Sequence, residues 1–312
     1  MSLIKKKVPC YKNICICLEF LFVCVIFVFK YKFVVAKVSK YLRISILLVV
    51  IGGVVTSLMQ LLLGNFPIDI FAFPLNIVIM AVWLYLLIDL YRHREHHAVA
   101  RYLLSNEATW LSIVLLVVAC MAMGLQREPA TTSYPFVVAI FFVLTQLTMV
   151  ILRGCRNGKG IRWRFVFNHV GLWLAIGAGF WGAPDMQVLR LSVSALQPES
   201  VAYRMDGGIT PLGYDVQLVD FRAEFFDNGV PSSYEADVMI DNEKVSLSVN
   251  HPYAQSFTED IYLTAYDYNE NGASCILQVV KQPTKWIMAV GIMMLIAGAV
   301  MMFVQGYNPK EL

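Results

Sequence analysis

The sequence predicts a membrane α-helical protein with about six transmembrane helices and one extracytoplasmic all-β antiparallel domain. The chain has 312 residues, 58% of them hydrophobic, and a mean hydropathy of +0.62. A soluble protein of this length needs far less apolar material for its core. The charges are divided unequally: residues 184–285 carry 15 acidic and 6 basic side chains, and the rest of the chain carries 7 acidic and 19 basic ones. Such a division is typical of a polar domain on one side of a membrane and basic loops on the other.

A helix needs roughly 20 apolar residues to cross the hydrocarbon layer of a bilayer. Six apolar stretches meet or approach that length: 44–63, 69–91, 111–125, 135–152, 167–183 and 286–305. Every second connection is rich in Lys and Arg, whereas the alternate connections contain only Arg127 as a base. Basic loops stay in the cytoplasm, so residues 184–285 are expected outside and the tail from Tyr307 inside. We therefore predict a multi-pass protein of a bacterial inner membrane with its large domain on the periplasmic side.

The first 36 residues do not fit this pattern. Residues 14–29 are apolar enough to form a further span, but lysines flank them on both sides. A span there would place the N-terminal lysines outside, against the positive-inside rule, and no small-residue cleavage site of a signal peptide follows. We interpret 1–36 as an upstream extension or an interfacial segment. The expected organisation is then a five-helix region (37–183), the β domain (184–285) and a final helix with its tail (286–312).

The segment 184–285 shows the alternation of β-strands. Apolar side chains occupy every second position in 214–218, 236–240 and 245–249, a period of two. Asp241-Asn242-Glu243 between the last two runs favours a hairpin turn. The strongest hairpin prediction joins 261–268 to 274–280 through Asn271-Gly272, because Asn-Gly suits a turn with positive φ. Several short strands with such turns predict an antiparallel sandwich or barrel.

Most residues whose side chains could bind a metal or react have an ordinary structural interpretation. His93 and His97 would lie on one helical face with metal-ligand spacing, but a hydrated juxtamembrane cluster is the simpler explanation. We expect His251 to be a turn residue rather than a ligand. The Cys15-x-Cys17 pair lacks the two-residue spacing of metal and redox motifs. The methionines of the last stretch could ligate iron, although helix packing is their more common use; they are Met288, Met293, Met294, Met301 and Met302.

His169 differs because it lies within an apolar stretch near its cytoplasmic boundary. An ionisable residue inside a span is a functional candidate, although a neutral imidazole bonded to a neighbouring helix explains it equally well. Gly171, Ala175 and Gly179 follow at four-residue spacing and would allow another helix to approach closely. Motifs for phosphate binding or nucleophilic catalysis are absent from the sequence. Nucleic-acid binding is excluded, because the basic residues lie in short loops between apolar stretches.

An ordered set of short motifs resembles the ResB (CcsB) family of cytochrome c biogenesis proteins. The resemblance covers roughly 44–312 and is most specific from 165 onward. The set is Asn168-His169-x-Gly171-Leu172, Gly182-Ala183-Pro184-Asp185-Met186-Gln187-x-Leu189-Arg190-Leu191, Pro211-Leu212-x-Tyr214-x-Val216-x-Leu218-x-Asp220-Phe221, Gly229-x-Pro231-Ser232-x-Tyr234, Val249-Asn250-His251-Pro252-Tyr253, Glu259-Asp260-Ile261-Tyr262 and Ile276-Leu277-Gln278-Val279-Val280-Lys281-Gln282-Pro283.

The resemblance implies a subunit, itself non-catalytic, of a cytochrome c synthetase. With a ResC/CcsA-type membrane partner it would handle haem, export it and present it for attachment to apocytochrome c. A histidine of the family serves an inner haem site, and His169 is the best match here, with transient haem b as the expected cofactor. Phe165 and Trp173 share the face of His169 on a helix, and Arg162 and Arg164 would attract the propionates.

Two other functions are compatible with the sequence. One is a membrane-anchored structural or assembly protein whose β domain binds a periplasmic protein without touching haem. The other is a transporter, which the scarcity of polar residues in the apolar stretches disfavours, although His169, Gln146 and Thr145 are candidates for a polar path.

Overall fold

The computed structural model describes residues 39–125, 130–157, 160–205, 207–228, 231–269 and 272–305. The chain divides into two compact units. One contains the described helices up to Phe180 together with the chain from Val290, and the other consists of Trp181–Ala289. The segment 14–36 and Arg127, both used in the predictions above, lie outside the described residues.

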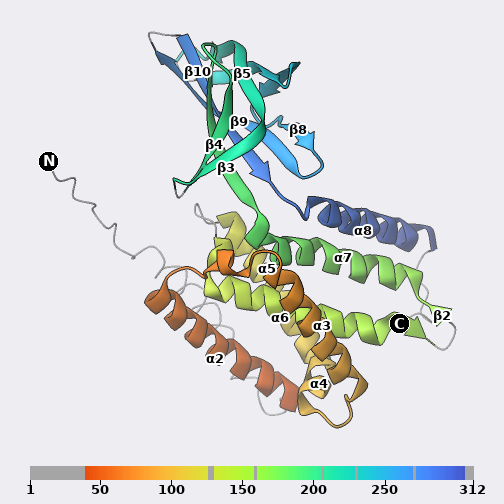
Figure 1. Cartoon of the computed structure of the whole chain (residues 1–312). Coiled ribbons are helices and arrows are strands. Elements are labelled where there is room, and N and C mark those ends of the chain that lie inside the picture. The colour runs from red at the N-terminus through yellow and green to blue at the C-terminus, as the bar shows by residue number, and fades with distance from the viewer. Residues whose placement is uncertain are drawn as a thin grey trace. The chain divides into compact units, whose positions relative to one another are not determined.

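Within the described part of the chain, six helices are long and apolar enough to cross a membrane, as the sequence predicted. They are α2 (Lys40–Leu63), α3 (Leu75–Arg92), α5 (Asn106–Leu125), α6 (Tyr134–Gly154), α7 (Trp163–Gly182) and α8 (Lys285–Gln305) (Figure 1). The helix α4 (Ala98–Leu103) is too short to span. These helices expose many leucines, isoleucines and valines, which suits a lipid environment. The chain is therefore a multi-pass membrane protein.

The helix boundaries follow local signals that the hydropathy pattern does not contain. The Ser39 hydroxyl accepts a hydrogen bond from the amide of Leu42 (3.1 Å) and caps α2. The second span was predicted from residue 69, but α3 begins only at Leu75. A 3₁₀ turn, η2 (Ile68–Phe71), precedes it, and Pro74 stands immediately before the first helical residue. Proline is tolerated at a helix start but not in its interior, so the regular helix begins after it.

Helix α6 is the central helix of the first unit. Half of the residues in its most apolar stretch are buried, compared with 11–22% in the other five spans. It contacts α2, α3 and α5. Polar side chains link it to these neighbours. The Gln60 side chain of α2 accepts from the Tyr134 amide (2.9 Å), and Gln146 donates to the Thr109 hydroxyl of α5 (3.0 Å). Such bonds satisfy groups that would be costly to leave unpaired in a membrane.

The second unit is an antiparallel sheet of eight strands in the order β7-β6-β5-β4-β3-β10-β9-β8. The strands are β3 (Gln187–Ser194), β4 (Glu199–Arg204), β5 (Ile209–Phe225), β6 (Pro231–Ile240), β7 (Glu243–Ser248), β8 (Tyr253–Ser256), β9 (Glu259–Asn269) and β10 (Gly272–Lys281). The edge strands β7 and β8 are consecutive in the chain, and a bridge between Ser248 and His251 joins the end of β7 to the turn before β8. The sheet thus curls until its edges approach, as in a barrel.

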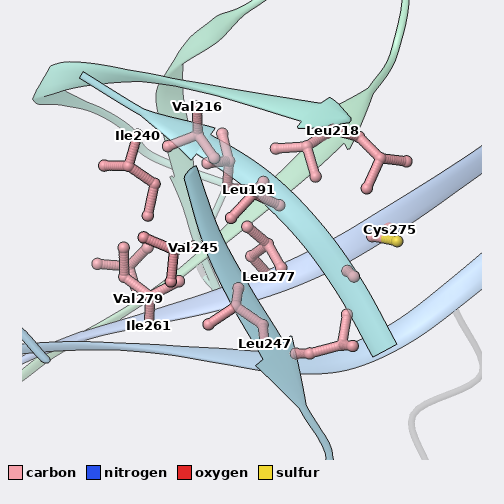
Figure 2. Close-up of a cluster of buried hydrophobic side chains, with 14 of the residues drawn as sticks. Leu191, Val216, Leu218, Ile240, Val245, Leu247, Ile261, Cys275, Leu277 and Val279 are labelled. Carbon is pink, nitrogen blue, oxygen red and sulfur yellow. The ribbon is translucent and has the colours of Figure 1, made fainter. Parts of the chain in front are cut away.

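The interior of this barrel is the hydrophobic core of the unit. Alternate residues from seven strands point inward and form one cluster (Figure 2). Leu191, Val216, Val238, Leu277 and Val279 are each at most 1% exposed. The predicted alternation at 214–218, at 236–240 and at Val245 and Leu247 therefore identified the inward side chains correctly. The prediction was wrong for Val249, which lies beyond the end of β7 and is 36% exposed. Strands β3, β4 and β8 were not predicted individually.

The two predicted hairpins differ in detail from the prediction. The β6–β7 turn has two residues, Asp241 and Asn242, with φ of 44° and 69°, while Glu243 already belongs to β7. Both positive φ values fit a turn that matches the twist of the strands. In the β9–β10 hairpin, Gly272 pairs with Asn269 and is the first residue of β10. The turn residues 270 and 271 lie outside the described part of the chain.

Candidate functional site

The candidate site lies at the beginning of α7. The chain leaves α6 through the short strands β1 (Arg156–Asn157) and β2 (Gly160–Ile161) and returns to the helical region. The Arg162 amide then donates to the Cys155 carbonyl (3.0 Å), and α7 starts at the next residue. The Arg162 carbonyl accepts from the Val166 amide (2.9 Å), so Arg162 is fixed directly before the first turn of α7.

His169 is held by Phe165, one turn earlier on the same helix. The two rings stack with centroids 3.9 Å apart and an interplanar angle of 17°. The Nδ1 atom of His169 lies 2.9 Å from the Phe165 carbonyl oxygen. A carbonyl can only accept, so Nδ1 carries the proton in this arrangement and Nε2 keeps its lone pair. The side chain thus has a fixed ring plane and one nitrogen able to bind a metal or accept a proton.

Phe165 itself is confined from two further directions. A Cβ atom added to Gly154, at the end of α6, would lie 2.2 Å from the Phe165 ring. The Phe165 ring therefore occupies the space that the missing side chain of Gly154 leaves free. The guanidinium carbon of Arg162 lies 5.2 Å from the centre of the same ring, within cation–π distance. Arg162, Phe165 and His169 consequently form a continuous stack along one face of α7.

Trp173 continues this face but is turned toward α6. Its indole nitrogen donates to the Thr148 hydroxyl (2.9 Å), and that hydroxyl donates to the Leu144 carbonyl (2.8 Å). The indole N–H is therefore satisfied within the helix bundle. Phe165 and Trp173 both contact α6, and His169 lies between them in sequence on the same face.

Arg164 lies on a different face of α7. Asn168 follows it by four residues and donates its amide to the Arg164 carbonyl (2.8 Å). A Cβ atom at Gly298 of α8 would meet the Asn168 side chain at 2.7 Å, and one at Gly171 would meet the backbone of Gly291 at 2.8 Å. Residues 164, 168 and 171 are thus on the side of α7 that packs against α8. The structure brings together Arg162, Phe165, His169 and Trp173, but places Arg164 apart from them.

The small residues of α7 mediate packing within the chain, where the helix that approaches them closely is α8. Helices α7 and α8 lie side by side (Figure 1). A Cβ atom at Gly291 would come within 2.6 Å of the Ala175 amide nitrogen. Only glycine at these positions allows the two backbones to approach so closely.

The other candidates do not form a metal site. Helix α3 ends at Arg92, and His97 lies in extended backbone just before the separate helix α4, so His93 and His97 are not on one helical face. His93 instead pairs with Asp89, with 3.3 Å between Nδ1 and Oδ1. Among the described residues, no group of three or more His, Cys, Asp or Glu side chains is arranged to hold a metal ion. Met293 and Met302 are more than half exposed on α8.

Sequence reasoning missed the two residues of α6 that position the site. Gly154 reads as an ordinary helix end, and nothing in its sequence neighbourhood indicates that a ring fills its place. Thr148 had a visible signal, because it is a polar residue inside an apolar span. Neighbouring Gln146 and Thr145 were noted for that reason, but Thr148 was not.

Comparison with known proteins gives one result for this chain. A family model described as the ResB-like family matches residues 111–276, more than half of the chain and both of its compact units. No curated protein matches the sequence. The matched range includes α7 with His169 and the strands up to the middle of β10. The chain therefore belongs to the ResB-like family, whose members take part in cytochrome c biogenesis.

Proposed function

We propose that this protein is the haem-handling subunit of a cytochrome c synthetase in a bacterial inner membrane. With a ResC/CcsA-type membrane partner it receives haem near the cytoplasmic boundary of α7 and helps to present it to apocytochrome c. The β barrel lies on the periplasmic side, where the apocytochrome is found. The family match supports a role in cytochrome c biogenesis, and the basic connections before α2, α4 and α7 support this orientation.

The proposal rests on the hydrogen bond that fixes the tautomer and the ring orientation of His169. A histidine that ligates a metal usually donates its second ring N–H to a carbonyl or carboxylate, which fixes its tautomer and orientation. The bond of His169 Nδ1 to the Phe165 carbonyl, 2.9 Å, has this form and leaves Nε2 for iron. In this proposal His169 would hold haem b through its iron, and the haem would supply an iron centre and the vinyl groups that become attached to the apocytochrome.

The contacts of the two aromatic residues support positioning roles for them. Phe165 lies nearly parallel to the imidazole and against Gly154. We therefore assign to Phe165 the role of orienting His169, rather than that of packing directly on the porphyrin. Trp173 fixes α7 to α6 through Thr148 and closes the same face one turn further along. Both are therefore positioning residues in this proposal.

We assign the propionates mainly to Arg162. Its guanidinium lies over Phe165, on the face of His169, and a guanidinium binds carboxylates well. Arg164 lies on the side of α8. We assign to it a smaller contribution, as additional positive charge at the same level of the helix.

The test is an absorbance spectrum of the full-length protein, purified alone and with its membrane partner. We compare wild type with His169→Gly and with the matched control His251→Gly, whose residue lies in the barrel. Wild type and the control should show a Soret band that His169→Gly loses, and added imidazole should restore the band in His169→Gly. An unchanged band in His169→Gly would refute this ligand assignment. No band in any preparation of the intact complex would favour the assembly protein that never touches haem.

A further inference from the structure

The chain enters and leaves the barrel at one end. Gln187, the first residue of β3, pairs with Lys281, the last residue of β10. The sheet is antiparallel throughout, so its turns alternate between this tethered end and the opposite end. The connections from α7 to β3 and from β10 to α8 are only a few residues long.

The β4–β5 hairpin makes its turn at the tethered end. Tyr203 of β4 pairs with Ile209 of β5 and lies level with Arg190, near the start of β3. Both side chains point away from the core, and Met205 follows in the turn. Their exposed fractions are 52% for Tyr203, 68% for Met205 and 67% for Ile209.

A second apolar side chain lies at the same end, in the turn between β8 and β9. Phe257 is 90% exposed. Its neighbour Thr258 accepts a hydrogen bond from the Gln282 amide (2.7 Å), three residues before α8 begins. Nearby, Lys285 in the first turn of α8 pairs with Asp260 of β9, with 2.5 Å between the charged atoms. These two bonds hold Phe257 at the level of the first turn of α8.

That first turn has the composition of a membrane boundary. Lys285 is followed by Trp286, which is 56% exposed, and the apolar run of α8 starts there. Trp and Lys at the end of a span mark the level of the lipid headgroups. Phe257 therefore lies at headgroup level, where an exposed phenyl ring is stabilised by leaving water.

We propose that the tethered end of the barrel inserts into the surface of the lipid bilayer. We define the lipid rim as Tyr203, Met205, Ile209 and Phe257; it docks the barrel on the membrane through two points, the β4–β5 hairpin and the β8–β9 turn. The opposite end also exposes apolar side chains, Leu196 and Phe226. They follow β3 and β5 at the ends away from the tether, so they remain in water and provide matched controls.

The test uses the full chain in nanodiscs of phosphatidylethanolamine and phosphatidylglycerol, without any partner. Four single-cysteine chains, Phe257→Cys, Met205→Cys, Leu196→Cys and Phe226→Cys, carry a nitroxide in a background without the native cysteines. We expect labels at 257 and 205 to be relaxed by lipid-soluble oxygen and shielded from a water-soluble nickel chelate. Labels at 196 and 226 should show the reverse. Equal access of the chelate to all four positions would refute the proposal.

Hydroxyl-radical footprinting of the unsubstituted chain in the same nanodiscs is a second measurement that avoids any effect of the substitutions on folding. Oxidation of Met205 and Phe257, corrected for their reactivity in the unfolded chain, should be lower than that of Phe226 and Leu196. Full oxidation of Met205 and Phe257 in nanodiscs, with protection appearing only after the membrane partner is added, would assign the rim to a protein contact. That outcome would overturn lipid docking.

Discussion

Gly171 of α7 and Gly291 of α8 lie against each other without side chains between them. A Cβ atom at Gly171 would be 2.8 Å from the Gly291 carbonyl oxygen, and one at Gly291 would be 2.7 Å from the Gly171 carbonyl oxygen. Both obstacles are backbone atoms, which cannot move aside as a flexible side chain can. The two helices that enter and leave the barrel are therefore joined at this point by direct backbone packing.

Gly291→Ala should destabilise the helical unit by about 1–3 kcal/mol, the usual effect of overpacking a tight interface. The free energy of unfolding, measured by SDS titration in mixed micelles, gives this value. Gly52→Ala in α2 is the control, because an added Cβ there would meet nothing within 4 Å. We expect the control to be neutral or slightly stabilising, since alanine favours helix more than glycine. Equal stability of the two variants would contradict the tight packing of α7 on α8.

Gly154→Val should displace Phe165, whose ring fills the place of the missing side chain. The stack of Phe165 on His169 would then be lost while His169 itself is retained. If haem binds as proposed, the variant should keep haem but show a shifted Soret band and altered electron paramagnetic resonance of the ferric state. Gly124→Val on α5, where nothing lies within 4 Å, should leave both spectra unchanged. An unshifted spectrum in Gly154→Val would remove Phe165 from the positioning of the ligand.

Asp237 should make the barrel less stable in acid. Its carboxylate is nearly buried and pairs with Ser246, with Lys244 (3.0 Å) and with Arg222 (3.3 Å). The hydrogen bonds of Ser246 and Lys244 lower the pKa of Asp237 from its ordinary 3.8, although burial opposes the shift. The unfolded chain therefore takes up this proton first as the pH falls. The stabilisation is complete above pH 3.8 and is lost as the pH falls through the lower pKa of the folded barrel.

Denaturant unfolding at a series of pH values tests this prediction. Wild type should lose stability between pH 4 and pH 2 more steeply than Asp237→Asn, which cannot take up that proton. At neutral pH, Asp237→Asn should be less stable by about 1–2 kcal/mol, because hydrogen bonds to a charged group are lost. Parallel curves for the two proteins would show that the native and unfolded states bind this proton equally.

Cys275 should report the opening of the barrel. It is fully buried in the core, and burial raises the pKa of its thiol to about 12. Maleimide reacts with the thiolate, so labelling of Cys275 at neutral pH should be undetectable until denaturant opens the barrel. Leu196→Cys, at an exposed turn, is the reactive control. Rapid labelling of Cys275 in the native protein would contradict a closed hydrophobic core.

The local pattern of the sequence accounts for most of the secondary structure. The six apolar stretches all became long helices, because apolar length is the main requirement for crossing a bilayer. The start of α3 was misplaced by six residues, since hydropathy does not register the effect of Pro74 on helix geometry. The alternation in β5, β6 and β7 identified the inward side chains, because a strand turns every second residue to the same side.

The sequence by itself determined that the chain is a multi-pass membrane protein with an antiparallel β domain, and it identified the ResB-like family and the place of His169. Hydropathy and strand alternation are properties of short segments, so they can be read before the chain is folded. Only the tertiary structure decided between a sandwich and a barrel, because that depends on how the whole sheet curls to bring its edge strands β7 and β8 together. The tertiary structure also showed that Gly154 packs against Phe165 and that Arg164 lies on the side of α7 that faces α8. These contacts depend on which helix faces meet, and long-range packing decides that.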